Sequence, residues 1–276
     1  MATESLAELI RFAPDVYGFR WANHVALFIV TGAGVILVDP IGQVNPRTPA
    51  LIKEAIRAVT AEPVRYVVYS HSAFDHSTGG AVFADTARFV GHRNTVKPIT
   101  AANDPTTPPP DVTFDVRTTL ELGGRRVDLY PADLSPTDDY IVVHDPASRL
   151  AMFVDLVQPR NVPFRTLLGH PDRILERFRW IEDHLDFDVI VSGHATPQMS
   201  GTKADVVEQR RYHEDLAEAI ATARAAGLAD ASPEMTDRVR SILAPKYGAW
   251  RRFDEFLPLN VAGMIAWRAG QSPSAH

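Results

Sequence analysis

A strand–helix–strand pattern between Gly34 and Tyr69 constrains the fold more than any other feature of the sequence. Residues 34–38 and 64–69 are short runs rich in β-branched and aromatic side chains, which are typical of strands. Between them, residues 49–60 carry apolar side chains at helical spacing. A helical crossover joins strands that run parallel in one sheet. The chain is therefore predicted to be an α/β protein whose sheet is at least partly parallel.

Strand and helix patterns continue on both sides of this crossover, and their order repeats in outline: strands, a helix, a strand, then a loop rich in His and Asp. Further strands are expected over residues 16–19, 25–31, 88–91, 140–144, 151–154 and 188–191. The segment 112–130 predicts two or three antiparallel strands that turn at Gly123–Gly124, and 171–185 predicts an amphipathic helix.

Prolines and glycines divide the remaining segments. Four prolines between residues 100 and 111 predict an irregular loop. Residues 204–269 read as almost wholly helical, with breaks expected near Gly227, Pro233, Gly248 and Pro258.

Composition narrows the chemistry that such a chain can carry. With 276 residues, of which 45% are hydrophobic, the chain can bury a large core. It contains no cysteine, so that only His, Asp and Glu side chains could bind a metal ion. A formal net charge of −6 with scattered Arg residues offers no basic patch for a phosphate backbone, and nucleic-acid binding is not expected.

The sequence shows no pattern for export or for a membrane span. Residues 1–10 contain Glu4 and Glu8 and lack the basic start and apolar stretch of a signal peptide. The longest uncharged run, residues 21–38, is broken by polar and glycine residues and is shorter than the roughly 20 apolar residues that a membrane span needs. We expect a cytoplasmic protein that does not bind membranes.

The loop after the strand at 64–69 is the first candidate for chemistry. His71, Asp75 and His76 lie within six residues, and Gly79 and Gly80 end the segment. Side chains this close in sequence converge only if the backbone curls around a common centre. A divalent cation is the simplest such centre, since imidazole and carboxylate suit zinc and related metals.

Four segments together resemble the metallo-β-lactamase-fold hydrolases. Ser70 to Gly80 resembles the His-x-His-x-Asp-His loop of that family, which follows a strand and precedes Gly-Gly. Val38 to Pro40 resembles the family's strand-end Asp, Phe153 to Leu156 the strand bearing its metal-bridging Asp, and Val191 to His194 its final His loop.

This resemblance implies an αββα sandwich of two mixed sheets with a metal site along one edge. We expect residues 1–200 to form that domain. Residues 201–276 would form a C-terminal helical extension packed on it.

Two positions depart from the family pattern. The third position of the first loop, a His in the family, is Ala73, and a second family His falls on Leu134. By this mapping the family's first metal site keeps His71 and Asp155 alone and is depleted.

The second metal site of the family is complete in this sequence. By the same resemblance its ligands are Asp75, His76, Asp155 and His194. We expect one divalent ion there, with zinc as the default and with iron and manganese open as alternatives. The other histidines outside the motifs have no partner at ligand spacing and are expected to be structural; they are His24, His92, His144, His170, His184 and His213.

The expected function is that of a mononuclear metal-dependent hydrolase acting on a small ester, lactone, amide or thioester. The expected catalytic residues are His71 and Asp75, with His71 acting as a base or orienting the substrate, although it could also be a residual buried polar residue. The alternative is a metal-free or ligand-binding member of the fold that catalyses an isomerisation or elimination, or acts as a binding protein. The expected partner is a small-molecule substrate, and a homodimer is a further expectation.

Overall fold

The computed structural model describes residues 7–134, 138–194, 199–230 and 232–271, and these form two compact units. The first unit consists of Met1–Ala132, Asp138–Val154 and Asp186–Ser200. The second consists of Asp133–Thr137, Asp155–Leu185 and Gly201–His276. One junction, Ser200–Gly201, coincides with the expected domain boundary, while the division into domains 1–200 and 201–276 stays a prediction.

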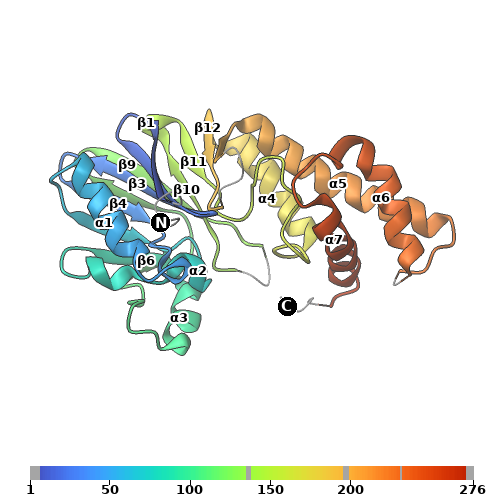
Figure 1. The fold of residues 1–276 in the computed structure, drawn as a ribbon, viewed down its shortest axis with the longest axis horizontal. Helices are drawn as coiled ribbons and strands as arrows, with labels where there is room; N and C mark the ends of the chain where they lie inside the picture. The colour runs from blue at the N-terminus through green and yellow to red at the C-terminus, as the bar shows by residue number, and fades with distance from the viewer. Residues whose placement is uncertain (1–6, 135–137, 195–198, 231, 272–276) are drawn as a thin grey trace, which may run out of the picture. The chain divides into compact units, whose positions relative to one another are not determined.

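The first sheet of the first unit has seven strands in sequence order (Figure 1). They are β1 (Ala7–Ala13), β2 (Val16–Trp21), β3 (His24–Thr31), β4 (Gly34–Val38), β5 (Val64–Val68), β6 (Arg88–His92) and β7 (Val112–Phe114). Strands β1 to β4 pair antiparallel, and β4 to β7 pair parallel. Helix α1 (Thr48–Val59) joins β4 to β5, which confirms the predicted crossover.

The second sheet has six strands in the order β13-β12-β11-β10-β9-β8. Their bounds are β8 (Thr118–Leu122), β9 (Arg125–Pro131), β10 (Ile141–Asp145), β11 (Leu150–Met152), β12 (Val189–Val191) and β13 (Ser200–Gly201). Strands β8 to β11 pair antiparallel, whereas β11 and β12 pair parallel. Both sheets are therefore mixed, and the α/β class is confirmed.

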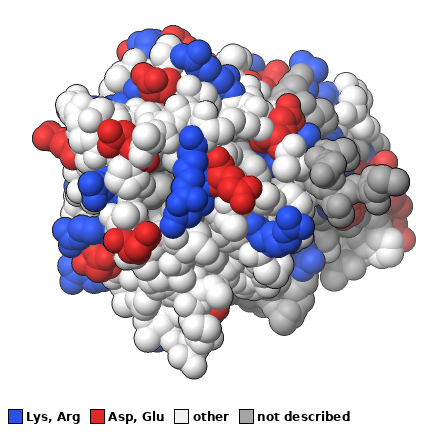
Figure 2. Space-filling view, turned by 60° about the vertical axis from the view of Figure 1, so that its left-hand side comes forward, with Lys and Arg blue, Asp and Glu red and all other residues white. Residues whose placement is uncertain are grey.

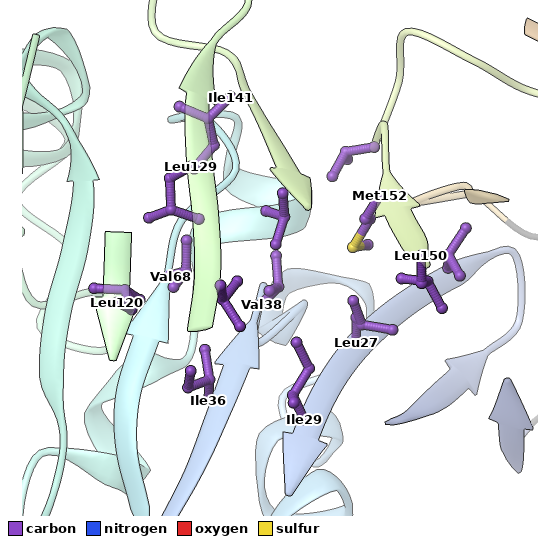
Figure 3. Packing of buried hydrophobic residues seen from close by; sticks show 14 of the residues in the cluster. Leu27, Ile29, Ile36, Val38, Val68, Leu120, Leu129, Ile141, Leu150 and Met152 are labelled. Carbon is purple, nitrogen blue, oxygen red and sulfur yellow. The ribbon is translucent and has the colours of Figure 1, made fainter. Parts of the chain in front are cut away.

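Apolar side chains of the two sheets meet in one core (Figure 3). Leu27 and Ile36 from the first sheet and Leu129 and Ile141 from the second are 0–2% exposed. Full burial of each such side chain contributes about 1.5–3 kcal/mol. The alternate residues of the first sheet pack instead with Ile52 of α1 and its neighbours, since successive side chains of a strand point to opposite faces.

Two details of the first unit differ from the expectations. Strand β7 pairs parallel with β6 in the first sheet, so it is not part of the antiparallel set predicted over 112–130, while β8 and β9 do pair across Gly123–Gly124. Helix α3 (Val96–Ala102) runs into the segment 100–111 that was predicted to be irregular. The helix ends before Pro105, the first proline of that segment.

The second unit contains four helices among its described residues: α4 (Pro171–His184), α5 (Lys203–Ala225), α6 (Pro233–Tyr247) and α7 (Phe253–Arg268). The predicted breaks at Gly227 and Gly248 are confirmed, but the break at Pro258 is wrong because Pro258 lies inside α7. An internal proline costs a helix about 3 kcal/mol. Burial of seven α7 side chains, Leu257 and Val261 among them, offsets that cost.

The second unit also buries a histidine that the site chemistry does not involve. His213 on α5 is 3% exposed, and its ring centroid lies 5.8 Å from that of Phe178 on α4. Burial lowers the pKa of His213 to about 4, because the surroundings disfavour the charged imidazolium.

We predict that His213 makes the protein acid-sensitive. Above pH 6.5 the imidazole is neutral in both the folded and unfolded states, so it has no effect on stability there. Between pH 6.5 and the folded pKa of about 4 only the unfolded state gains the proton, and the free energy of unfolding falls by about 3 kcal/mol in total. Urea unfolding of the wild type and His213→Gln at pH 7.5 and 4.5 measures this loss.

The variant should lose less stability on acidification than the wild type, by about 2–3 kcal/mol. His184→Gln, an exposed change in the same unit, serves as the control and should retain the wild-type dependence. An equal loss in the wild type and His213→Gln would contradict the assignment.

Candidate metal centre

The loop after β5 curls into a single helical turn that presents Asp75 and His76. Helix α2 (Phe74–Ser77) begins after Ala73, whose carbonyl oxygen accepts hydrogen bonds from the backbone N–H groups of His76 (3.1 Å) and Ser77 (2.9 Å). The carbonyl oxygen of His76 accepts from the N–H of Ile41 at 3.0 Å. These bonds fix the turn against the segment that follows β4.

A second loop, after β12, carries His194 and lies against the start of β3. The N–H of Val25 donates to the carbonyl oxygen of Gly193 at 2.8 Å, and the N–H of Gly193 donates to that of Val154 at 2.8 Å. His24 and His194 form an isolated β-bridge. A Cβ on Gly193 would lie 2.3 Å from Val154 Cγ1 and 3.0 Å from His76 Cε1, so this close approach requires glycine.

Four side chains of the first unit converge where these segments meet. His24, Asp75, His76 and His194 each offer one ligand atom, and those four atoms lie within 4.8 Å of one another. Asp75 Oδ2 is 3.0 Å from His24 Nε2 and 3.6 Å from His76 Nε2. His76 Nε2 and His194 Nε2 are 3.2 Å apart.

Asp39 supports this cluster from within the core. Its carboxylate is fully buried, and it accepts hydrogen bonds from the Ser70 N–H (2.8 Å) and the Ser70 hydroxyl (2.6 Å). Its Oδ2 atom also lies 3.3 Å from His76 Nδ1. A carboxylate facing Nδ1 places the ring proton there and directs the Nε2 lone pair toward the cluster, as in carboxylate–histidine–metal triads.

His71 lies beside the cluster and is tied to the same carboxylate. Its Nδ1 is 2.8 Å from the Ser70 hydroxyl oxygen. Because that hydroxyl donates its one proton to Asp39, it can only accept from His71, which puts the ring proton on Nδ1 and a lone pair on Nε2. The ring stacks on Tyr140 at 4.0 Å between centroids and is 4.9 Å from the ring of His76.

The donor set fits a divalent cation. Zinc with bonds of about 2.0–2.2 Å in tetrahedral geometry spaces its ligand atoms about 3.4 Å apart, and the three distances above range from 3.0 to 3.6 Å. Burial lowers the pKa of His24, as do the neighbouring imidazoles of His194 and His76, against the opposing effect of Asp75. A lowered pKa favours the neutral imidazole, which is the form that binds metals.

The structure brings together three of the four predicted ligands, Asp75, His76 and His194, and places His71 next to them. Asp155 is the first residue of the second unit and directly follows Val154; its role as a ligand stays a prediction. Leu134 also belongs to the second unit, where it is buried and its carbonyl oxygen accepts from the His170 N–H. Its equivalence to a family histidine likewise stays a prediction.

The expectation that His24 has no partner is wrong, because its Nε2 lies 3.0 Å from Asp75 Oδ2. Sequence reasoning missed it because 51 positions separate the two residues, so no local spacing links them. The available signal was its place in the turn between two predicted strands, at one end of the sheet.

Comparisons with known proteins bear on the family and the fold. The family model described as metallo-beta-lactamase superfamily matches residues 20–230. No curated protein matches the sequence. The structure of a stereoselective inverting sec-alkylsulfatase from Pseudomonas sp. is similar with a TM-score of 0.73 and 13% identity, over 94% of this chain and 49% of the sulfatase.

Two further solved structures are similar. A double mutant of the sulfatase gives a TM-score of 0.76 at 14% identity, over 96% of this chain and 50% of its own. A metallo-beta-lactamase from Pontibacter korlensis gives 0.62 at 22% identity, over 75% of this chain and 99% of its own. The chain thus spans about half the length of the sulfatases, and these likenesses bear on the fold alone.

We predict that Gly193→Ala displaces the His194 loop. The added methyl group would overlap Val154 and press on His76, and overpacking of this kind costs typically 1–3 kcal/mol. Thermal and urea unfolding should show that loss. Gly32→Ala is the matched control, since nothing lies within 4 Å of its Cβ position, and it should change stability by less than about 0.5 kcal/mol. Equal stability of the two variants would refute the packing argument.

Proposed function

The chain belongs to the metallo-beta-lactamase superfamily, and from that premise we propose that it is a hydrolase that uses one divalent metal ion. The observation that carries the proposal is the convergence of Asp75, His76 and His194 with their ligand atoms within 4.8 Å. Asp155 is proposed as a further ligand on the resemblance to the family. Zinc is the proposed ion, since nitrogen and oxygen ligands in a tetrahedral spacing suit it.

A cation in this site would polarise the scissile bond and lower the pKa of a water molecule. The chain's own contribution starts with Asp75 and the imidazoles of His76 and His194, which would hold the cation in position. The Asp39 carboxylate holds His76 in the tautomer that exposes Nε2 to the cluster.

His71 is proposed as the general base. Its Nδ1 proton is directed at Ser70, whose hydroxyl is in turn directed at Asp39, so that Nε2 can accept a proton from the attacking water. The imidazolium formed in this way would be stabilised through Ser70 by the buried negative charge of Asp39. The same chain of hydrogen bonds prevents the ring from turning its protonated nitrogen toward the substrate.

The proposed substrate is a small ester, lactone, amide or thioester. A sulfate ester is a second candidate substrate, and one observation favours it. The similarity to the sec-alkylsulfatases extends over 94–96% of this chain, whereas the similarity to the Pontibacter lactamase extends over 75% of it. The additional coverage supports an aliphatic sulfate as one of the substrates to be tested.

Three further expectations are retained as proposals: a small-molecule substrate, a homodimer and a cytoplasmic location. On the face drawn in Figure 2, side chains of both signs are interspersed, which supports the proposal that nucleic acid is not a partner. Among the described residues, no helix combines the length and apolar character that crossing a membrane demands.

We predict that the purified protein binds about one equivalent of zinc and that His194→Ala loses it. The variant removes one imidazole and leaves His76 Nε2 without the neighbouring donor 3.2 Å away. Elemental analysis after dialysis against buffer with micromolar zinc measures the content. His92→Ala, a buried change on β6 of the same unit, is the control and should keep the ion. A wild type that stays metal-free after reconstitution would favour the metal-free alternative.

We predict that His71→Gln keeps the metal and loses turnover by roughly 100-fold or more, the size of a typical general-base contribution. Ser70→Ala should retain the base but lose its orientation and lower kcat less than His71→Gln does. Initial rates with an aryl acetate, a lactone, a thioester, an aryl amide and a secondary alkyl sulfate identify the substrate and measure both effects. Full activity of His71→Gln with normal metal content would make His71 a residual polar residue.

A further inference from the structure

His24 occupies a position in the first unit that no family motif accounts for. It is the first residue of β3, it is 8% exposed, and its ring centroid is 4.5 Å from that of His194 and 5.4 Å from that of His76. The β-bridge to His194 and the bond from Val25 N–H to Gly193 fix its backbone. The side chain is therefore held rigidly at the cluster and has little freedom to turn away from it.

We infer that His24 is itself a ligand of the metal ion, so that the first unit alone supplies a three-histidine, one-aspartate centre. The inference deepens the proposed function and rests on it, because it requires that an ion bind at Asp75, His76 and His194. It changes the ligand set, however, since a motif-based mapping assigns no role to the turn between β2 and β3.

The hydrogen-bond partners of the ring support this assignment. His24 Nδ1 is 3.0 Å from the side-chain oxygen of Asn23, an acceptor that places the single proton of a neutral imidazole on Nδ1. Nε2 then directs a lone pair toward Asp75 Oδ2, 3.0 Å away. Nε2 and Oδ2 approach this closely only with a proton or a metal ion between them, and the same holds for His76 Nε2 and His194 Nε2 at 3.2 Å. A single metal ion would serve both pairs at once.

Two of the three rings of the cluster face a different partner on the side away from the proposed metal. Asn23 faces Nδ1 of His24, and Asp39 faces Nδ1 of His76. Outer contacts of this kind are the usual companions of metal-bound histidines, because they fix the tautomer and the ring orientation. Four donors suffice to hold the ion when the Asp155 carboxylate is removed, and expansion to five-coordinate would admit the attacking water.

The direct test uses the full-length wild-type protein, labelled with ¹⁵N in its histidines and loaded with ¹¹³Cd²⁺. A nitrogen bonded to the metal shows a ¹¹³Cd–¹⁵N coupling, and the inference requires three coupled Nε2 atoms, those of His24, His76 and His194. Only two coupled nitrogens in the wild type, both unchanged in His24→Ala, would overturn it while leaving the proposed metal site intact. A protein that binds no cadmium or zinc would refute the proposed function itself.

Zinc affinity gives a second readout that does not depend on activity. Competition with a chromophoric chelator should show that His24→Ala weakens zinc binding by more than 100-fold, whereas loss of an outer-shell contact weakens it typically by 10–100-fold. Asp155→Ala should still bind one equivalent, and His92→Ala should match the wild type. A loss of 100-fold or less in His24→Ala would assign His24 to the outer shell and overturn the inference.

Discussion

A buried carboxylate at the end of β4 determines the arrangement of the whole site. Asp39 has no solvent exposure, and its backbone adopts a left-handed conformation with φ of 58°, which is costly for a residue other than glycine. That conformation turns the carboxylate back toward the loop after β5, where Ser70 donates two hydrogen bonds to it and His76 Nδ1 lies 3.3 Å away. Removal of any partner would leave a buried charge poorly compensated. These contacts fix the backbone of the loop after β5, and that backbone sets the positions of His71 and His76.

The elements with local signals were predictable from the sequence. The crossover through α1 and the hairpin at Gly123–Gly124 follow from periodicity and turn residues. The loop with Asp75 and His76 was recognisable because its residues are close in sequence. Strand β1 was missed because its side chains are mostly exposed or half-buried, so it lacks the apolar run that marks an interior strand.

The rest depended on contacts between distant segments. His24 reaches Asp75 because β3 begins beside the loop after β12, a consequence of how two sheets meet rather than of any motif. Pro258 was misread for a related reason: a proline predicts a helix break only when tertiary burial is too small to offset it, and α7 buries half of its sixteen residues. Sequence patterns of neighbouring residues therefore mispredict structure where packing between distant segments contributes most of the stabilising free energy.

The position of His194 has a consequence for the stability of a protein without cysteine. His76 follows β5 of the first sheet and His194 follows β12 of the second, and 118 positions separate them. A cation bound by both would cross-link the two sheets in the folded state only, because the unfolded chain offers no preformed site. Its binding free energy would therefore add to the free energy of unfolding and would grow with the concentration of free metal. The ion would then hold the two sheets together along one edge, and its removal by a chelator would lower the stability of the fold as well as remove the reactive centre.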